Sequence, residues 1–296
     1  MARNAGRLSL IADRPSCSAL TASAFSSPRP VARGRRAFSL IELLVVVSVT
    51  ALLVSILLPS LRRAREQARA TVCASNIRQL VVANAAYASE HKGRYCPGGA
   101  EMKTGNLHRW HGTRSDRDEP FDPRHGPLVP YLGAGEGIRA CPSFRDFVRD
   151  GDAAFEKGNG GYGYNQAYIG RIVRKHSNGS FEVVTDCYGV LSERIRQPGQ
   201  TVMFTDAAFA GTAAGVIEYS FAEPRFHPEW IQFEARADPS IHFRHDKAAN
   251  VAWCDGHVGR EIRTFTWRSA VCAGDPDREN IGWFGQADDN GYFDLQ

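Results

Sequence analysis

Imidazole and carboxylate side chains that could meet around a metal ion gather in the C-terminal third of the chain. They are Asp206, His242, His245, Asp255 and His257. These side chains are of the types that zinc and other divalent ions bind. His242 and His245 are three residues apart, which suits one face of a helical turn but opposite faces of a strand. We favour a structural role, in which His245 hydrogen-bonds the turn at Asp255 and holds a hairpin.

Cysteines supply a second group of reactive side chains. Six follow the basic N-terminal segment, and an even number fits disulfides in an exported domain, with fifteen pairings open. None of them forms a C-x-x-C pair, which argues against a zinc ribbon or a thioredoxin-like motif. They are Cys73, Cys96, Cys141, Cys187, Cys254 and Cys272.

Catalytic motifs are absent from the sequence. It has no G-x-S-x-G elbow, H-E-x-x-H pair, P-loop or dinucleotide fingerprint. Tryptophans and tyrosines could stack on sugars, although core packing explains them more simply. We therefore expect a structural protein rather than an enzyme, and no cofactor, with zinc or calcium as the alternatives.

An apolar segment, residues 38–58, precedes the candidate site residues and determines where the rest of the chain is placed. It contains a single charge, Glu42. At about 1.5 Å per residue, a helix of this length spans roughly 30 Å, the thickness of a bilayer's hydrocarbon core. A carboxylate there costs several kcal/mol unless it finds a partner. An ordinary signal peptide would place a small-residue cleavage site after its apolar stretch, and none occurs before Pro59.

Basic residues are concentrated in residues 1–37, which hold seven arginines and one acidic residue. The rest of the chain carries a slight excess of acidic residues. The formal charge of +4 therefore does not indicate a nucleic-acid partner. Arginines flank residues 38–58 on both sides, so the positive-inside rule orients this segment only weakly.

The segment Gly34–Ala68 resembles the N-terminus of type IV prepilins and type II secretion pseudopilins. The resemblance implies cleavage between Ala37 and Phe38, and methylation of the new terminus at Phe38. Ala37 stands where the family normally has glycine. Glu42 then occupies the fifth mature position, where the family's carboxylate is thought to pair with a neighbouring subunit's terminal ammonium. Pro59 falls where many pilins carry a helix-kinking proline.

Later motifs resemble a second bacterial pilin-like family whose biochemical role is not established. Its C-terminal signature is a histidine, nine residues and Asp-Gly, matched here by His245 and Asp255-Gly256. The other matching segments are Cys73–Leu80, Gly93–Tyr95, Arg139–Ser143 and Tyr162–Asn165.

The elements of the head can be read from residue patterns. Apolar residues at helical spacing continue the helix to Glu90, where glycines and a proline stop it. Two hairpin turns are predicted at Asn178-Gly179 and Asp255-Gly256. Strand-like runs are Tyr168–Arg174, Ser180–Thr185, Thr201–Thr205, Gly215–Tyr219, Ala249–Trp253 and His257–Ile262.

We therefore expect an α+β fold, with a long N-terminal hydrophobic helix packed against an antiparallel β-sheet head, as in pilins. The predicted organisation is a basic leader removed by a prepilin peptidase, a transmembrane and assembly helix, an amphipathic continuation, and an exported head. The respective ranges are 1–37, 38–58, 59–90 and 91–296.

These features predict a pseudopilin-like subunit of a type II secretion or type IV pilus-like filament. It would cross the inner membrane once, with a cytoplasmic leader and a head in the periplasm or outside the cell. Expected partners are the prepilin peptidase, other pilin-like subunits through the N-terminal helix, and the membrane. The resemblance also makes calcium an option, because pseudopilin heads sometimes use it, and the tail carries acidic oxygen ligands: Asp275, Asp277, Glu279, Asp288, Asp289 and Asp294.

Two alternatives remain open at this stage. One is a membrane-tethered metal-binding enzyme or glycan-binding domain that uses a pilin-type anchor. The other is an ordinary single-pass protein whose leader is never cut.

Overall fold

The computed structural model describes residues 38–133, 137–148, 156–211, 215–229, 236–268 and 274–295. The chain divides into two compact units, residues 1–53 and 54–296. The predicted leader, including Ala37, lies outside the described residues, as does Cys272.

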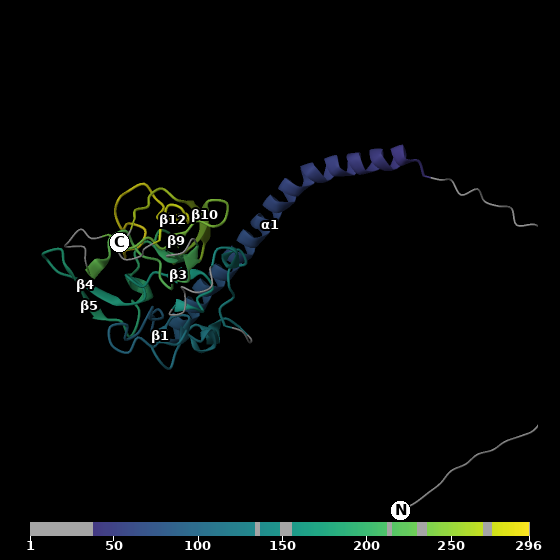
Figure 1. Cartoon of the computed structure of the whole chain (residues 1–296). Coiled ribbons are helices and arrows are strands. Elements are labelled where there is room, and N and C mark those ends of the chain that lie inside the picture. Colours follow the sequence, from purple (N-terminus) through teal and green to yellow (C-terminus); the bar gives the residue numbers. More distant parts are fainter. Residues whose placement is uncertain are drawn as a thin grey trace, which may run out of the picture. The chain divides into compact units, whose positions relative to one another are not determined.

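A single long helix, α1 (Leu40–Glu90), is the first element of the chain (Figure 1). It begins with a reciprocal cap: the Ser39 hydroxyl accepts the Ile41 N–H at 3.2 Å, and the Glu42 carboxylate accepts the Ser39 N–H at 2.9 Å. This is a capping box, because both side chains satisfy backbone donors that a helix start leaves free. Pro59 lies inside α1 without ending it, and the helix stops at Glu90, as the sequence predicts.

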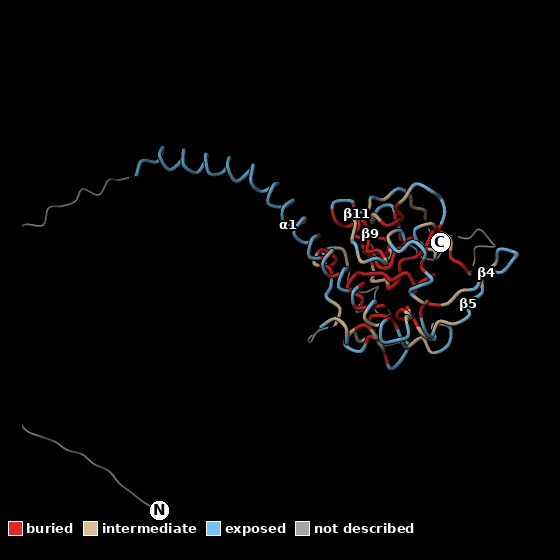
Figure 2. The backbone as a smooth tube through the Cα atoms, turned by 180° about the vertical axis from the view of Figure 1, so that it is seen from behind, coloured by how far each residue is buried: buried red, intermediate tan, exposed pale blue. Residues whose placement is uncertain are grey.

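The first part of α1 exposes its apolar side chains. Every residue from 40 to 65 is exposed (pale blue in Figure 2). Its most apolar window has a mean hydropathy of 2.7 and none of it is buried. A core helix of a soluble protein would bury most of such a window. Among the described residues, α1 is the one helix with the length and composition to cross a membrane.

The later part of α1 packs on the head. Its buried positions recur at intervals of three and four, which marks one face of a helix. They are Ala70, Cys73, Asn76, Ile77, Leu80, Val81, Ala83, Asn84 and Ala88. This spacing shows that α1, whose first part is apolar and exposed, contributes one face of its later part to the core of the head.

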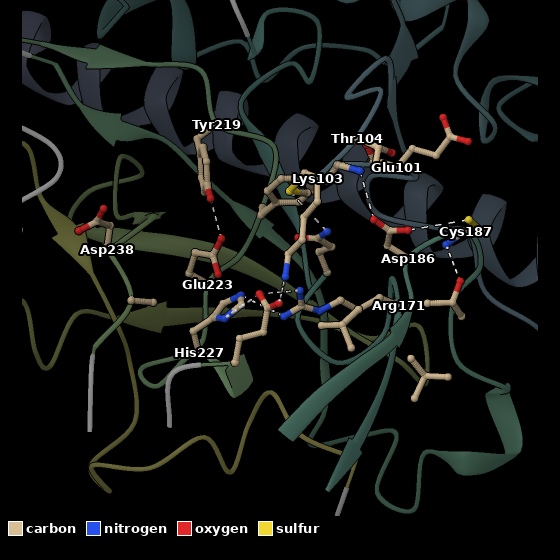
Figure 3. Close-up of a pocket in the computed structure, with 18 of the residues that line it drawn as sticks. Glu101, Lys103, Thr104, Arg171, Asp186, Cys187, Tyr219, Glu223, His227 and Asp238 are labelled. Atoms are coloured by element: carbon tan, nitrogen blue, oxygen red, sulfur yellow. Dashed lines mark hydrogen bonds and ion pairs between the residues drawn. The ribbon is translucent and has the colours of Figure 1, made fainter. Parts of the chain in front are cut away.

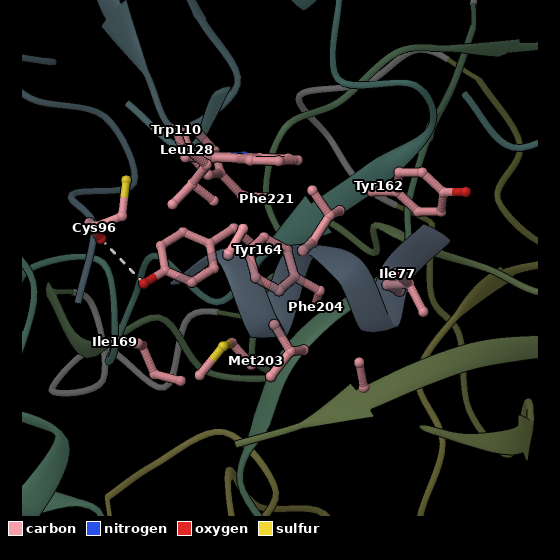
Figure 4. Close-up of a cluster of buried hydrophobic side chains, with 14 of the residues drawn as sticks. Ile77, Cys96, Trp110, Leu128, Tyr162, Tyr164, Ile169, Met203, Phe204 and Phe221 are labelled. Carbon is pink, nitrogen blue, oxygen red and sulfur yellow. Dashed lines mark hydrogen bonds between the residues drawn. The ribbon is translucent and has the colours of Figure 1, made fainter. Parts of the chain in front are cut away.

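The main sheet has the order β11–β10–β6–β3 and is antiparallel throughout. Its strands are β3 (Tyr162–Tyr164), β6 (Val202–Asp206), β10 (Ala248–Trp253) and β11 (Val258–Ile262). Strands β6 and β10 are buried at every position. Figure 4 shows their surroundings, with Ile77 of α1 in the same cluster as Tyr164, Met203 and Phe204. The predicted α+β class is confirmed.

Short elements complete the head. Two-stranded antiparallel pairs are formed by β1 (His108–Arg109) with β2 (Gly112–Thr113), β4 (Ile172–Lys175) with β5 (Phe181–Thr185), β7 (Phe209–Ala210) with β8 (Val216–Ile217), and β9 (Ile241–His242) with β12 (Ile281–Gly282). Single 3-10 turns are η1 (Pro123–His125), η2 (Val129–Tyr131), η3 (Phe144–Asp146) and η5 (Ser192–Arg194).

The predicted strand Tyr168–Arg174 is largely wrong. The Asn165 carbonyl accepts the N–H groups of Ile169 and Gly170, so the chain turns here and β4 begins only at Ile172. The Asn165 amide also donates to Val202 at 2.9 Å and to Phe293 at 2.8 Å. A buried amide that binds three segments holds this stretch in a turn despite its strand-like composition.

The packing of α1 leads to a stability prediction. Leu80 is 2% exposed in the core, whereas Val82, on the same helix, is 59% exposed. We expect Leu80→Ala to lower the free energy of unfolding by about 2–5 kcal/mol, because it leaves a cavity. Val82→Ala is the control and should change it by less than about 0.5 kcal/mol. Denaturant unfolding of the detergent-solubilised chain measures both, and equal losses would contradict the assigned helix face.

Candidate metal centre

Four buried side chains from distant parts of the sequence converge beside α1. They are Cys73, Cys141, Asp206 and His245, and each offers one ligand atom within 4.8 Å of the others. All four residues are 0% exposed. Among the described residues, this is the one group of three or more histidine, cysteine or carboxylate side chains that is close enough to hold a metal ion.

Regular elements position two of the four. Cys73 lies on the buried face of α1, and Asp206 is the last residue of β6, opposite Tyr162 of β3. Both positions are set by packed backbone rather than by a loop, so their side chains are held in place.

Tight turns position the other two. The backbones of His245 and Ala248 exchange hydrogen bonds of 2.9 and 3.1 Å around Asp246 and Lys247. Both central residues have positive φ, 52° and 61°, as a two-residue hairpin turn requires. Cys141 donates its N–H to Gly160 at 2.9 Å and accepts that of Phe144 at 3.1 Å, where η3 begins.

The four side chains contact one another directly. The Cys73 thiol donates to Asp206 Oδ1 at 3.0 Å, and Cys141 Sγ lies 3.4 Å from His245 Nε2. His245 Nε2 is also 3.5 Å from Asp206 Oδ2. These three contacts link the four side chains in a row, and a hydrogen bond between Cys73 and Cys141 completes a ring.

A surrounding set of groups orients the ring. The buried Arg244 guanidinium donates to Asp206 Oδ1 at 2.7 Å, and the Asn250 N–H donates to Oδ2 at 2.7 Å. Glu66 Oε1 lies 2.9 Å from His245 Nδ1 and also accepts the Ser143 hydroxyl at 2.9 Å. Because Glu66 can only accept, Nδ1 carries a proton and Nε2 faces the cluster.

The protonation of the cluster follows from burial and charge. Burial raises the pKa of the Cys73 thiol. The hydrogen bond with Cys73, followed by the charge of Arg244, lowers the pKa of Cys141. Burial lowers the pKa of His245, but the hydrogen bond with Cys141 and the charge of Asp206 reverse this, so its pKa is raised overall. The cluster therefore favours proton sharing around a carboxylate.

The structure brings together two of the five side chains proposed from sequence, Asp206 and His245. His242, on β9, is held elsewhere: its Nδ1 accepts from Arg244 at 3.1 Å, and its ring packs edge-on against Phe147 at 4.9 Å. Burial, then the charge of Arg244, lowers the pKa of His242 well below its usual range. His242 is thus a neutral core histidine.

The predicted hydrogen bond between His245 and the turn at Asp255 is wrong. Strand β10 separates them, and six residues at about 3.3 Å each place its ends on the order of 20 Å apart. Asp255 instead accepts from His257 Nδ1 at 2.7 Å in the predicted Asp-Gly turn. The turn itself is confirmed, since Gly256 has φ +93° between β10 and β11.

Cysteine chemistry differs from the disulfide expectation. The five described cysteines, Cys73, Cys96, Cys141, Cys187 and Cys254, are free thiols. Sequence reasoning missed Cys73 and Cys141 as companions of His245. No spacing pattern could reveal them, because 67 residues separate the two along the chain.

Arginines pair with Asp275, Asp277 and Asp288, three of the six carboxylates of the acidic tail that the sequence offers as calcium ligands. Asp288 pairs with Arg225 and Arg236, at 3.3 and 2.5 Å. Asp277 pairs with Arg263 at 2.7 Å, and Asp275 with Arg268 at 3.1 Å. Arginines therefore already neutralise these oxygens.

A separate cavity of about 700 Å³ lies between the loop of residues 101–104, the β4–β5 hairpin and the chain that follows β7. Lys103 and Arg171 both donate to Glu229. Figure 3 shows Tyr219 above Glu223, to which it donates at 2.6 Å. Burial raises the pKa of Glu223. The cavity is large enough for a small polar ligand.

One buried serine, Ser220, lies beside a histidine and a carboxylate as in a catalytic triad, but its hydrogen bonds differ from those of a triad. The Ser220 hydroxyl donates to Glu156, which Arg109 binds at 2.7 Å, and His111 Nε2 lies 2.7 Å from Ser220 Oγ. Because the serine proton points to Glu156, His111 donates to the oxygen and does not act as its base. All four residues are buried.

Comparison with known proteins identifies the N-terminal segment. Residues 32–58 match the family model of the prokaryotic N-terminal methylation motif. No curated protein and no solved structure is similar to the chain. The motif, together with the exposed apolar part of α1, supports a type IV pilin-like, membrane-anchored protein with a single span. It is consistent with processing by a prepilin peptidase and association with other pilins.

The cluster's central ion pair leads to a second prediction. Asp206→Asn removes the charge opposite Arg244, whose side chain is 0% exposed. An unpaired buried guanidinium should cost about 3–5 kcal/mol of unfolding free energy.

Asp255→Asn is the matched control. It removes the ion pair between Asp255 and His257, whose side chains are 40% and 51% exposed respectively. The free energy of unfolding should fall by less than about 1 kcal/mol, because exposed ion pairs contribute little. Chemical unfolding compares the two, and a small effect at Asp206 would show that water reaches Arg244.

Proposed function

We propose that the chain is a pseudopilin-like structural subunit that assembles through its N-terminal helix into a type II secretion or type IV pilus-like filament. The observation that carries the proposal is the methylation motif at the start of α1, whose first part is apolar and exposed while its later part builds the head core. Exposed apolar helices can pack side by side in such an assembly.

Processing is the first step of the proposed pathway. The prepilin peptidase cuts between Ala37 and Phe38 on the cytoplasmic side of the inner membrane, and Phe38 becomes the methylated terminus. The head is exported to the periplasm or the cell exterior. The motif match across residues 32–58, which contain the cut, supports this assignment.

Glu42 has two candidate roles that can be separated. Within its own helix the carboxylate accepts the Ser39 N–H. In the proposed assembly it pairs with the terminal ammonium of a neighbouring subunit. A glutamine serves the capping box as well as a glutamate does, but it carries no charge.

The mature N-terminus tests processing. We expect intact-mass and terminal-peptide measurements on membrane-extracted protein to give a chain that begins at Phe38 with one methyl group. A mature chain that still carries Arg35 and Arg36 would contradict the proposal and leave an anchored domain.

Two substitutions at Glu42 test assembly. We expect both Glu42→Gln and Glu42→Ala to insert into the membrane but to fail to join filaments, because each removes the charge. Cross-linking and filament shearing measure incorporation. If Glu42→Gln assembles like the unaltered chain and only Glu42→Ala fails, then Glu42 acts as a helix cap alone.

A further inference from the structure

We propose that Cys73, Cys141, Asp206 and His245 bind one structural zinc ion that fastens α1 to the head. The four ligand atoms come from a helix, a turn, a strand end and a hairpin, and they already lie within 4.8 Å of one another. This inference does not depend on assembly, since the cluster lies wholly within residues 54–296.

The geometry of the ring fits a tetrahedral ion. Zinc with bonds of about 2.0–2.3 Å holds its ligand atoms roughly 3.3–3.8 Å apart. The observed contacts are 3.0 Å from Cys73 to Asp206, 3.4 Å from Cys141 to His245, and 3.5 Å from His245 to Asp206. All four ligand atoms lie within 4.8 Å of one another, so side-chain shifts of up to about 1 Å would bring every pair to this spacing and admit the ion.

The ligand types select the metal. Two thiolates and an imidazole are borderline-soft ligands that suit zinc, whereas calcium and magnesium take oxygen ligands. Four protein ligands leave no open coordination position, and all four residues are 0% exposed. A closed site of this kind stabilises a fold rather than activating water.

The neighbouring groups already have the orientation that a zinc site needs. Glu66 binds His245 Nδ1 at 2.9 Å, which leaves the Nε2 lone pair for the metal. Arg244 and the Asn250 N–H hold the two oxygens of Asp206, each at 2.7 Å. A cavity of about 370 Å³, lined by Glu66, His245 and Arg260 among others, adjoins the His245 side of the cluster.

The charges of the cluster permit the exchange of two protons for one zinc ion. Without metal, Asp206 and Arg244 neutralise each other, the Cys73 thiol is neutral, and Cys141 and His245 share one proton as a pair with no net charge. When zinc enters, Cys73 releases one proton and the Cys141–His245 pair releases the other, and the two thiolate charges balance the ion. The buried group therefore has the same net charge in both states, so zinc adds no uncompensated charge to the interior.

Metal content of the full chain, extracted in detergent, tests the proposal. We expect one zinc per chain by elemental mass spectrometry, and at least a tenfold loss in Cys141→Ser and His245→Gln. Cys96→Ser and His257→Gln are matched controls that should keep the zinc. Cys96 is also a fully buried free cysteine, and His257 lies outside the group.

Two further measurements do not depend on the folding of these variants. Cobalt added to the stripped, unaltered chain should produce a thiolate-to-cobalt charge-transfer band. Glu66→Gln, at a side chain that is 31% exposed, should lower zinc affinity by roughly tenfold in a chelator competition while the unfolding midpoint of the metal-free chain stays unchanged.

Three results would overturn the proposal. One is a folded, unaltered chain that carries no zinc and gives no cobalt band. Another is zinc that persists in both Cys141→Ser and His245→Gln. The third is an intact mass lower by two hydrogens, with a disulfide mapped between Cys73 and Cys141.

Discussion

The buried charge of Asp206 is the constraint on which the head's arrangement depends. A carboxylate with 0% exposure is tolerated only where other groups replace its lost water. Arg244, Cys73 and the Asn250 N–H do so from the chain before β10, from α1 and from β10 itself. Satisfying one charge thus fixes the helix, β6 and β10 against one another. A shift of any of these would leave an ion or a donor unpaired in the core, so polar geometry selects the helix register that apolar packing alone would leave loose.

Local sequence was sufficient to predict α1 because its signals are local. An uninterrupted apolar run predicts a helix long enough to span a bilayer, and residues at three- and four-residue spacing predict the face that Ile77 and Leu80 bury. The two hairpin turns at Gly179 and Gly256 were predicted for the same reason, since both glycines adopt the positive φ that such turns need. In the predicted strand Tyr168–Arg174, residues 168–171 instead form a turn, because the side chain of Asn165 overrides the composition of its neighbours.

The candidate metal centre was only half predictable, and the reason is physical. Residue types make Asp206 and His245 candidate ligands, but spacing cannot show which side chains meet in three dimensions. Cys73 and Cys141 join them because α1 packs beside the end of β6, and the turn before η3 packs beside the hairpin that carries His245. The residue type of His242 suggests a ligand, but His242 lies on β9, whereas the left-handed turn at Asp246 and Lys247 directs His245 toward Glu66. Tertiary packing, rather than local pattern, decides membership in such a group.

The capping box at Ser39 resolves a difficulty in the proposed assembly. An apolar span with an unpaired carboxylate would be unstable in the bilayer before it found a partner. Glu42 is not unpaired, because it accepts the Ser39 N–H within its own helix. A neighbour's ammonium offers a charge-assisted hydrogen bond, about twice as strong as one from a neutral amide. In the proposed assembly, exchange of the backbone donor for the ammonium is then favourable, and it releases the Ser39 N–H. On this account one carboxylate serves the single subunit as a helix cap and the filament as an ion-pair partner.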